Sequence, residues 1–413
     1  MTTDPTPLRH KPKVLLVMTS TKPGFDGDYL RFRKILPLLS QTNDISLLYL
    51  DSDEHSEDFQ TFADYFADAE RFRYQPQPAG ISTRILDFLT LRPTESLQRR
   101  DPALLAQLKD LLSELIERKK IDLVLSWVRS TEQFLQHLNV PVIFDLCDAL
   151  SLQLYQELPA KGSIRQWLYY QRVKRFESEI VANYPVTFVS EKDANWFPHQ
   201  LDVSIITNGV DLSAECKSTQ AQEPGAIVFS GAMSFMPNVK AALYFADEVL
   251  PLITAGYPKL RWYVVGTNPT SAILALKEHP NVVVTGTVDS VASYINRAQV
   301  VINPMISGSG IKNKVLEAMS LARPVVSTSL GVDGIACANG EHVLIADEPR
   351  DFADAVLHLL IDETARQRLA NAARHLVATQ YTWTQTAKQY KSLFDRLIEH
   401  RSTRIGRCND QRC

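Results

Sequence analysis

Short apolar runs recur along the chain, and each is followed by a helical pattern or by a turn. Runs of this kind are typical of strands that are covered on both faces in a parallel sheet. Strands that alternate with helices predict a doubly wound α/β fold. The runs are KVLLVM, ISLLYL, IDLVLSW, VPVIFDL and PVTFVS up to residue 190, and AIVFSG, LRWYVVG, NVVVTG, AQVVINP and RPVVST from residue 226.

A polar segment separates the two series of strands and indicates a domain linker. It reads VSIITNGVDLSAECKSTQAQEPG, with an Asn-Gly turn and an end that contains Gly and Pro. At 413 residues the chain is long enough for two or three domains. We predict a disordered leader over residues 1–12, a first domain over 13–209, a second over 210–383, a terminal helix over 384–400 that crosses back to the first domain, and a tail over 401–413.

Composition argues against several classes of protein. The formal net charge of -3 disfavours binding of nucleic acid through bulk attraction to phosphates. No apolar run reaches the roughly eighteen residues that span a bilayer, and the N-terminal MTTDPTPLRHKPK lacks the apolar core of an export signal. The five cysteines show neither CxxC nor Cys/His metal spacing, so we expect free thiols and no metal site. These features predict a cytoplasmic protein.

A glycine-rich junction, SGSG over residues 307–310, follows a strand and precedes a helix expected over 311–321. Glycines let the backbone approach a ligand closely, and the N–H groups at a helix start attract an anion such as a diphosphate. Glu317 lies about two turns into the helix, where its carboxylate can accept hydrogen bonds from the vicinal hydroxyls of a ribose. Lys312 and Lys314 add positive charge. An ordinary junction with a solvated helix face fits the same pattern. The stretch contains neither GxGxxG nor GxxxxGKS, so it does not support a Rossmann dehydrogenase or a P-loop enzyme.

Several blocks together resemble glycosyltransferase family four, which has the GT-B fold. They are GSGIKNKVLEAMSLARPVVSTSLGVDGI, ITNGVD, FSGAMSFMPNVKAALYFADEVLPLI and WYVVGTNP, and the likeness covers nearly the whole chain. GDYLRFRKILPLL and VIFDLCDALS further resemble a bacterial branch of polysaccharide-associated sugar transferases. The resemblance implies two Rossmann-like doubly wound domains that face an interdomain cleft, with ligands outside the carboxyl ends of the strands.

The resemblance also implies a donor site in the second domain. Glu317 corresponds to the acid that holds the nucleotide ribose, and the loop before it lies against the diphosphate and the sugar. Backbone at the ends of neighbouring strands meets the nucleobase. The donor-binding residues expected in this domain are Gly266, Thr267, Val288, Gly308, Ser309, Gly310, Ile311 and Glu317.

The sequence departs from the family pattern at two places. The family's second acid, eight positions before Glu317, is replaced by Ser309. Its Arg and Lys after the first strand of the donor domain align with Ala232 and Pro237. Because the charge of the leaving diphosphate must be stabilised, we predict that Lys314 is catalytic in their place, with Lys312 and Arg31 in reserve. A solvated lysine is the alternative for both lysines.

The segment GFDGDYLR in the first domain supplies three further candidates. Gly27 permits close approach of the backbone to the donor, and Asp28 and Arg31 are expected to face the cleft from a helix start. The family branch has the same arrangement, which implies a catalytic role for Arg31. Asp28, on the acceptor side, has an alternative role as a helix cap.

Acidic residues at strand ends of the first domain are candidates for binding the acceptor. Asp145 and Asp148 follow a strand, where a carboxylate can orient a hydroxyl or act as a base, and we predict a catalytic role for Asp148. Formation of a turn or cap is the alternative. Cys147 stands where many family members carry His, and we expect a buried small residue there. Glu191 follows another strand and can reach the cleft or open a helix.

The resemblance implies a retaining glycosyltransferase. It would move a sugar from a nucleotide diphosphate sugar, as co-substrate, to a hydroxyl of a glycan or a lipid-linked saccharide in cell-surface or exopolysaccharide synthesis, with no other cofactor. A nucleotide-sugar epimerase of the same fold is an alternative and would need acids and a His converging on the sugar. A non-catalytic protein that binds sugar nucleotides is another, because it would tolerate loss of the Arg, the Lys and the first acid.

The segment KGSIRQWLYYQRVKRFESEI, residues 161–180, mixes basic and aromatic residues. An internal helix with its apolar face on the sheet is the preferred interpretation. Peripheral contact with an anionic membrane surface, at the inner face of the membrane, is the alternative.

Overall fold

The computed structural model describes residues 11–19, 27–51, 63, 66, 68–73, 80–82, 85–86, 95–127, 129–158, 163–212 and 222–410, without the side chains of 27–29, 95–96 and 402–410. The chain forms two compact units. The N-terminal domain comprises Met1–Ile206 and Thr386–Cys413, and the C-terminal domain comprises Thr207–Gln385. The expected boundaries at 209 and 383 lie within a few residues of these. Most of the expected leader, and residues 411–413 of the tail, lie outside the described residues.

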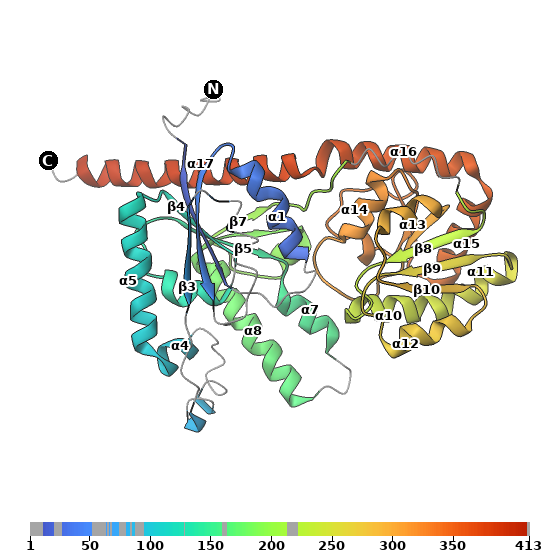
Figure 1. Ribbon diagram of the computed structural model, residues 1–413, viewed down its shortest axis with the longest axis horizontal. Helices are drawn as coiled ribbons and strands as arrows, with labels where there is room; N and C mark the ends of the chain where they lie inside the picture. The colour runs from blue at the N-terminus through green and yellow to red at the C-terminus, as the bar shows by residue number, and fades with distance from the viewer. Residues whose placement is uncertain are drawn as a thin grey trace. The chain divides into compact units, whose positions relative to one another are not determined.

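The N-terminal domain contains a parallel sheet of seven strands in the order β3-β2-β1-β4-β5-β6-β7. Figure 1 shows this sheet with helices packed around it. The central strands β1, β4 and β5 are almost wholly buried, as their apolar runs predict. The strands are β1 (Lys13–Thr19), β2 (Asp44–Asp51), β3 (Ala69–Arg73), β4 (Leu123–Ser126), β5 (Val142–Cys147), β6 (Pro185–Phe188) and β7 (Asp202–Ile205).

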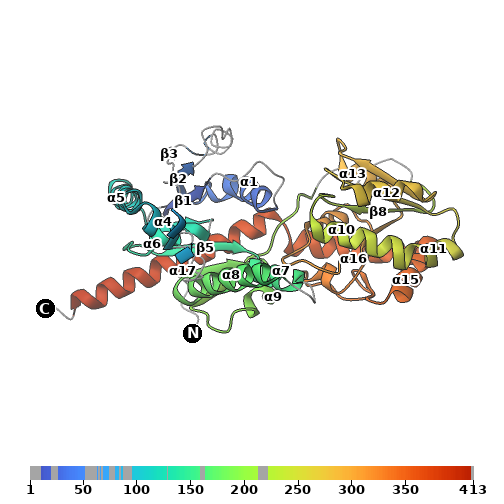
Figure 2. The ribbon, with the colours of Figure 1, turned by 90° about the horizontal axis from the view of Figure 1, so that it is seen from below.

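Helices of the N-terminal domain form where capping residues meet an apolar face. In α5, Asp101 accepts a hydrogen bond from the Leu104 N–H at 3.0 Å, and Leu108, Leu112 and Leu115 are buried against the sheet. Figure 2 shows α7 and α8, which pack side by side. The helices are α1 (Gly27–Leu39), α4 (Glu95–Arg100), α5 (Pro102–Lys119), α6 (Glu132–Leu135), α7 (Leu150–Glu157), α8 (Ile164–Asn183) and α9 (Glu191–Asn195).

The C-terminal domain contains a second parallel sheet, of six strands in the order β10-β9-β8-β11-β12-β13. The chain leaves β8 toward β9 and β10 and returns to β11 on the other side, so β8 and β11 flank the switch point at which such sheets bind ligands. The strands are β8 (Ala226–Ser230), β9 (Arg261–Val265), β10 (Val282–Gly286), β11 (Val300–Asn303), β12 (Val325–Ser327) and β13 (Leu344–Ile345).

Helices cover both faces of the second sheet, with α10 and α12 on one face and α13 and α14 on the other (Figure 1). The two Rossmann-like domains predicted from the sequence are thus confirmed. The helices are α10 (Met236–Tyr244), α11 (Leu250–Gly256), α12 (Ser271–Ala275), α13 (Val291–Arg297), α14 (Asn313–Ser320), α15 (Pro349–Ile361), α16 (Glu363–Gln380) and α17 (Trp383–Asp410).

Three details differ from the sequence prediction. The helix after the glycine loop begins at Asn313, because the backbone of Lys312 is extended, with φ -91° and ψ 92°. The final helix, α17, runs to Asp410 and so continues into the expected tail. The start of the expected linker is an edge strand, β7, whose residues are only half-buried and therefore lack a strong apolar signal. Within the described part of the chain, no helix is long and apolar enough to cross a membrane.

Candidate functional site

The carboxyl ends of β8 and β9 approach one another at two glycines. Gly231 and Gly266 have φ angles of +152° and +154°, which favour glycine. A Cβ on Gly266 would lie 1.6 Å from the Gly231 carbonyl oxygen, so no side chain fits there. The Met233 N–H donates to the Thr267 carbonyl at 2.8 Å and ties the loop after β8 to the loop after β9. Bare backbone is therefore presented at this edge of the sheet.

The glycine loop after β11 lies against the start of α10. Gly308 and Gly310 have φ angles of +114° and +67°, which explains the choice of glycine at both positions. A Cβ on Gly308 would lie 3.5 Å from the Cβ of Pro237. The loop thus rests on Pro237, one of the two uncharged positions at which the resemblance implied a basic residue. Ser307 is buried, and its Oγ has no hydrogen-bond partner among the described residues.

Lys312 turns back beneath this loop and is not a solvated side chain. Its Nζ donates to the carbonyl oxygens of Ser309 at 2.8 Å and Gly310 at 2.7 Å, and the residue is 8% exposed. A buried ammonium that holds two carbonyls fixes the conformation of the loop. Lys312 therefore stabilises the conformation of the glycine loop from its buried side.

Lys314 places a second ammonium at the carboxyl end of β8. Its Nζ donates to Asn238 Oδ1 at 2.6 Å and lies 4.3 Å from the centroid of the Phe229 ring. Within the described part of the chain, no carboxylate pairs with it. Burial, and to a lesser extent the charge of Lys312, lowers the pKa of Lys314 to about 7. Ala232 and Pro237 carry no charge where the resemblance implied an Arg and a Lys. Lys314 instead places an ammonium at the end of β8.

Glu317 lies on the same helix as Lys314, near its end. The residue is half-buried, and Ser320 Oγ donates to its backbone carbonyl at 2.8 Å. Val315, Leu316 and Met319 are buried and hold α14 on the sheet. The register of this apolar face decides which way the remaining side chains of α14 point.

The predicted donor residues of the C-terminal domain follow the carboxyl ends of three strands of one sheet. Gly266 and Thr267 follow β9, half-buried Val288 follows β10, and the loop 308–311 follows β11. Glu317 and Lys314 lie on α14, immediately after that loop. Because these strands are parallel members of one sheet, with only β8 between β9 and β11, the residues lie along the same edge of that sheet.

The predicted catalytic Arg31 is fully buried in the N-terminal domain. Its Nη2 donates to the Ile206 carbonyl at 2.8 Å and to Tyr390 Oη at 2.8 Å, and its Nε lies 3.4 Å from Asp145 Oδ2. Burial disfavours the charged form, but Tyr390 and Asp145 outweigh it and raise the pKa of Arg31. This placement differs from the expectation that Arg31 faces a ligand. Tyr390, which lies on α17, was not among the residues predicted from the sequence.

Asp145 is buried in the same network. Its Oδ1 accepts hydrogen bonds from Thr187 Oγ1 at 2.8 Å and from the Cys147 N–H at 3.2 Å, and its Oδ2 accepts one from the hydroxyl of Tyr390. A carboxylate with these partners fixes the end of β5 and does not face an acceptor, contrary to the prediction. Cys147 is buried, as predicted, and has a φ of +57°, a backbone conformation that is rare for a residue with a side chain.

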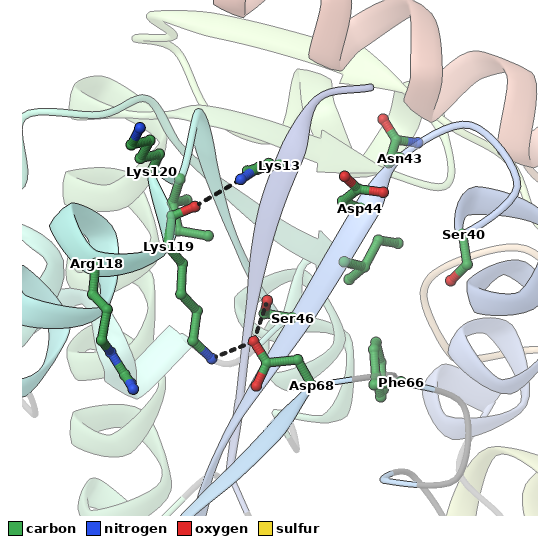
Figure 3. Close-up of a pocket in the computed structure, with 12 residues that line it drawn as sticks. Lys13, Ser40, Asn43, Asp44, Ser46, Phe66, Asp68, Arg118, Lys119 and Lys120 are labelled. Atoms are coloured by element: carbon green, nitrogen blue, oxygen red, sulfur yellow. Dashed lines mark hydrogen bonds and ion pairs between the residues drawn. The ribbon is translucent and has the colours of Figure 1, made fainter. Parts of the chain in front are cut away.

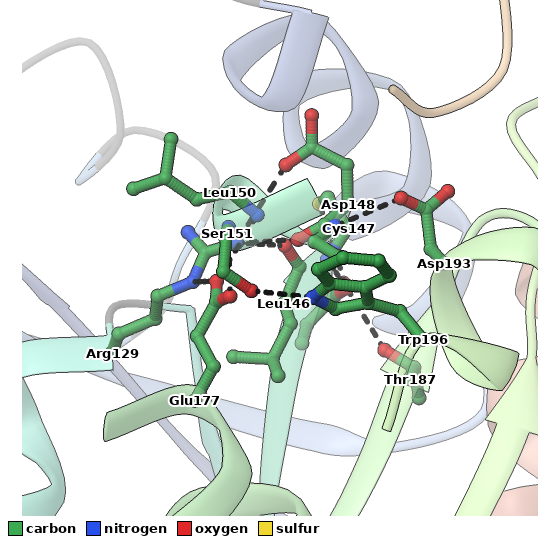
Figure 4. A network of polar contacts seen from close by, with 12 residues as sticks. Arg129, Leu146, Cys147, Asp148, Leu150, Ser151, Glu177, Thr187, Asp193 and Trp196 are labelled. Atoms are coloured by element: carbon green, nitrogen blue, oxygen red, sulfur yellow. Dashed lines mark hydrogen bonds and ion pairs between the residues drawn. The ribbon is translucent and has the colours of Figure 1, made fainter. Parts of the chain in front are cut away.

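Among the described residues, three acids lie at the turn after β5: Asp145, Asp148 and Glu177. The side chains of Asp145 and Glu177 are fully buried, whereas that of Asp148 is 35% exposed. Figure 4 shows it beside Arg129. Arg129 Nη2 lies 3.6 Å from Asp148 Oδ1 and donates to the Leu146 carbonyl at 2.9 Å, while its Nε lies 2.8 Å from Glu177 Oε1. The turn after β5 is thus held from one side by a single guanidinium.

Two buried acids that the sequence analysis missed occupy the N-terminal end of α7. Glu177 accepts hydrogen bonds from the N–H groups of Leu150 at 3.1 Å and Ser151 at 2.9 Å, and Asp193 accepts one from the Ala149 N–H at 2.9 Å (Figure 4). Protein carboxylates therefore fill the place that an anionic ligand would need. The sequence did contain a signal for Glu177, because an acid on the apolar face of α8 indicates a buried carboxylate with hydrogen-bond partners.

The remaining N-terminal candidates lie at helix starts. Glu191 is exposed and opens α9, which is the alternative role that the sequence offered. Gly27 and Asp28 form the backbone of the first turn of α1, and their side chains lie outside the described residues.

A surface cavity of about 660 Å³ lies elsewhere in the N-terminal domain (Figure 3). It opens at the amino ends of β1 and β2, where Lys119 Nζ pairs with Asp68 at 2.7 Å. The hydrogen bond from Lys119 lowers the pKa of Asp68. Ligands of parallel sheets bind at the opposite, carboxyl, ends of the strands, so this cavity is distinct from the predicted site.

No group of three or more potential metal ligands is present among the residues that the structure describes.

Comparison with known proteins identifies a family segment in the C-terminal domain. Residues 224–362 match the family model of glycosyl transferases group 1. An uncharacterized protein in the cps region of Klebsiella pneumoniae is 24% identical over 177 residues, which are 41% of this chain and 45% of that protein. The match therefore spans less than half of the relative's own length.

Solved structures resemble the chain over more than nine-tenths of its length. HepE from Anabaena, in complex with UDP, superposes with a TM-score of 0.66 at 15% identity and covers 93% of this chain and 100% of its own. Sucrose-phosphate synthase from Thermosynechococcus elongatus does so with a TM-score of 0.66 at 16% identity, over 94% of this chain and 100% of its own. These likenesses confirm the GT-B fold that the sequence motifs predicted.

Proposed function

We propose that this chain, whose C-terminal domain carries the glycosyl transferases group 1 segment, moves a sugar from a nucleotide diphosphate sugar to a hydroxyl acceptor. The observation that carries the proposal is the position of Lys314, an ammonium with a neutral partner at the switch point of the donor sheet. The structures of HepE contain UDP and, in one case, UDP-glucose, and they support a nucleotide sugar as the donor.

In the proposed site, each donor group meets a different part of the C-terminal domain. Glu317 accepts hydrogen bonds from the ribose hydroxyls, the backbone after β9 and β10 meets the nucleobase, and the loop 308–311 lies against the diphosphate and the sugar. Lys312 holds two carbonyls of that loop, so the loop keeps its shape without a ligand. Ser309 has no negative charge to offer the sugar, so the loop amides contribute more of this contact.

Lys314 supplies the charge that the leaving diphosphate requires. As the glycosidic bond breaks, negative charge develops on the diphosphate, and an ammonium close to it lowers the barrier. We infer that the configuration of the sugar is retained, with the leaving phosphate helping to deprotonate the acceptor on the donor face. The proposed mechanism requires no pair of carboxylates of the hydrolase kind and no metal ion.

We assign the acceptor to the N-terminal domain, with Asp148 as the residue that orients its hydroxyl. Asp148 is partly exposed, whereas Asp145 and Arg31 are buried with partners of their own. The similarity to a protein in a cps region supports a glycan or lipid-linked saccharide as acceptor, in synthesis of a surface polysaccharide.

We also propose peripheral contact with a membrane through the start of α8. Ile164, Trp167 and Tyr169 are 78%, 50% and 52% exposed, and Tyr155 on the neighbouring α7 is 53% exposed. Exposed Arg165 lies among them. Aromatic and basic side chains exposed on one helix suit the interface of an anionic bilayer. The second half of α8 packs on the sheet, so the two interpretations of this segment apply to different halves of one helix.

A panel of UDP, GDP, ADP, CMP and TDP sugars tests the donor site by thermal unfolding, because a ligand that binds only the folded state raises the melting temperature. One nucleotide should stabilise the wild type, and Glu317→Ala should abolish the shift without lowering the melting temperature of the free protein. Glu278→Ala, at an exposed site in the same domain, is the matched control and should keep the shift. No response to any donor would contradict the proposal.

A non-catalytic binding protein remains the second candidate because Ala232, Pro237 and Ser309 replace charged residues of the family. Formation of a glycoside from the stabilising donor and a saccharide acceptor would exclude it. Conversion of the donor to its epimer without an acceptor would instead identify an epimerase.

A further inference from the structure

Asn238 has a fixed orientation beside the proposed donor site. It lies in the first turn of α10 and is 6% exposed. Its Nδ2 donates to the Ala232 carbonyl at 3.0 Å, and its Oδ1 accepts from Lys314 Nζ at 2.6 Å. Because the Ala232 carbonyl only accepts and the ammonium only donates, both partners require the same orientation of the amide. The Oδ1 atom therefore faces Lys314.

The other neighbours of the Lys314 ammonium do not balance its charge. The Phe229 ring on β8 and the Met305 sulfur, 4.0 Å from Nζ after β11, carry no ionisable group. Asn238, from α10, is neutral. The charged group that acts on Lys314 is Lys312, before the same helix, and it has the same sign. Lys314 is half-buried, and an ammonium with these surroundings is poised to accept a negative ligand.

Gly231 shows how closely this pair lies against the end of β8. A Cβ at that position would lie 2.6 Å from Asn238 Nδ2 and 3.0 Å from Lys314 Nζ. The absence of a side chain lets the amide and the ammonium reach the backbone at the switch point. Asn238, Gly231 and Lys314 therefore form one unit built from β8, α10 and α14.

We propose that Asn238 is a positioning residue for the donor diphosphate: it holds the Lys314 ammonium at the carboxyl end of β8 through a neutral oxygen, so that the charge stays uncompensated until a diphosphate binds. The inference rests on the proposed function, and it adds a residue to which the family resemblance gave no role. An aspartate of the same shape would hold the ammonium equally well but would neutralise it.

Binding should then be coupled to a proton. The pKa of Lys314 lies at about 7 in the free protein, and a bound diphosphate raises it because an opposite charge favours the ammonium. Donor affinity should be constant below that pH and fall by about tenfold per pH unit above it, until the pKa of the complex is reached. The diphosphate of a nucleotide sugar is a diester and does not itself titrate in this range.

The test compares Asn238→Asp and Asn238→Ala with the wild type, using UDP-glucose, GDP-glucose, ADP-glucose and TDP-glucose as probes. Affinity is measured by calorimetry from pH 6 to pH 9, and the lysine pKa by NMR of the full chain labelled with 13C at lysine Cε, with the Lys314 signal identified by its loss in Lys314→Met. Asn371→Asp, at an exposed site on α16, is the control for an added charge in the same domain.

Asn238→Asp should raise the Lys314 titration midpoint by more than one pH unit, weaken donor binding at pH 6 by at least about tenfold, and flatten its pH dependence. Asn238→Ala should keep the low midpoint and weaken binding because the ammonium loses its position. Asn371→Asp should match the wild type in both measurements.

A Lys314 midpoint that Asn238→Asp leaves unchanged, together with wild-type donor affinity, would overturn the role of Asn238 and leave the proposed function intact. Failure of the wild type to bind any of the probes would instead overturn the donor site, and with it this inference. Melting temperatures of the free variants show whether each protein is folded.

Discussion

The two sheets end in opposite electrostatic arrangements. At the carboxyl end of β5 in the N-terminal domain, Arg31 lies beside Asp145 and Arg129 beside Glu177. At the carboxyl end of β8 in the C-terminal domain, Lys314 lies beside a neutral amide. Compensated charges hold a turn in one shape, because removal of either partner leaves the other buried and unpaired. An uncompensated charge stabilises nothing in the free protein and is available to a ligand.

Removing a compensated charge should give the largest effect. Arg31→Met leaves Asp145 buried without its cation and deprives Tyr390 and the Ile206 carbonyl of a donor. We expect the N-terminal domain to lose about 3–5 kcal/mol of unfolding free energy. Urea denaturation followed by fluorescence measures this loss. Arg368→Met, at an exposed site on α16, should change stability by less than about 0.5 kcal/mol.

If Arg31→Met unfolds like the wild type, the network around Asp145 does not hold the end of β5. The contrast between the two sheets would then have to be abandoned.

Removing the uncompensated charge should weaken donor binding without harming the fold. A charge-assisted hydrogen bond contributes about 1.5–3 kcal/mol, so Lys314→Met should weaken binding of the nucleotide sugar by about 10- to 100-fold. Calorimetry with the donor found by thermal unfolding measures the change. Arg374, whose Nε donates to the Ser320 carbonyl at 3.3 Å on the far end of α14, serves as a control when it is changed to Lys. Wild-type affinity in Lys314→Met would contradict the assignment.

Lys314→Met should weaken donor binding but stabilise the free C-terminal domain at neutral pH. Because the pKa of Lys314 is lowered from 10.5 to about 7, the unfolded chain binds the proton more readily than the folded one. The wild type therefore loses stability as the pH falls from about 10 to about 7, and Lys314→Met should not. The two unfolding free energies should differ most at pH 7 and below and converge near pH 10. A constant difference over this range would show that Lys314 is not desolvated in the free protein.

The exposed start of α8 should give the smallest effect. A half-exposed tryptophan offers only part of the about 1.5–3 kcal/mol that full burial provides, so Trp167→Ala should reduce binding to phosphatidylglycerol vesicles by about three- to tenfold. Sedimentation with vesicles measures the bound fraction. Ile361→Ala, 76% exposed on α15, is the control for loss of an exposed apolar side chain. Equal binding to vesicles of phosphatidylcholine alone would argue against recognition of anionic lipid.

The sequence predicted the central strands of both sheets and the edge strand β10, but it missed the other three edge strands, β3, β7 and β13. Strands such as β8 are wholly buried and appear as continuous apolar runs. Residues of β3 and β7 are at most half-buried, and β13 has only Leu344 and Ile345, so none of the three produces such a run. The sequence was likewise a poor guide to which polar residues are buried. Arg31 appears from its motif as a cation that faces the cleft, and its distant partners Asp145 and Tyr390 explain why it is buried.

The amino-acid sequence by itself determined the α/β alternation, the glycine loop and the candidate Lys314, because these depend on local periodicity and on residues close together in the chain. The tertiary structure decided which charges are compensated. Asn238 and Lys314 are far apart in sequence, as are Arg31 and Asp145, and the partner of each becomes apparent only when strands, helices and their loops meet at one edge of a sheet. The charge of a buried group depends on what surrounds it in space, and that information is absent from its neighbours along the chain.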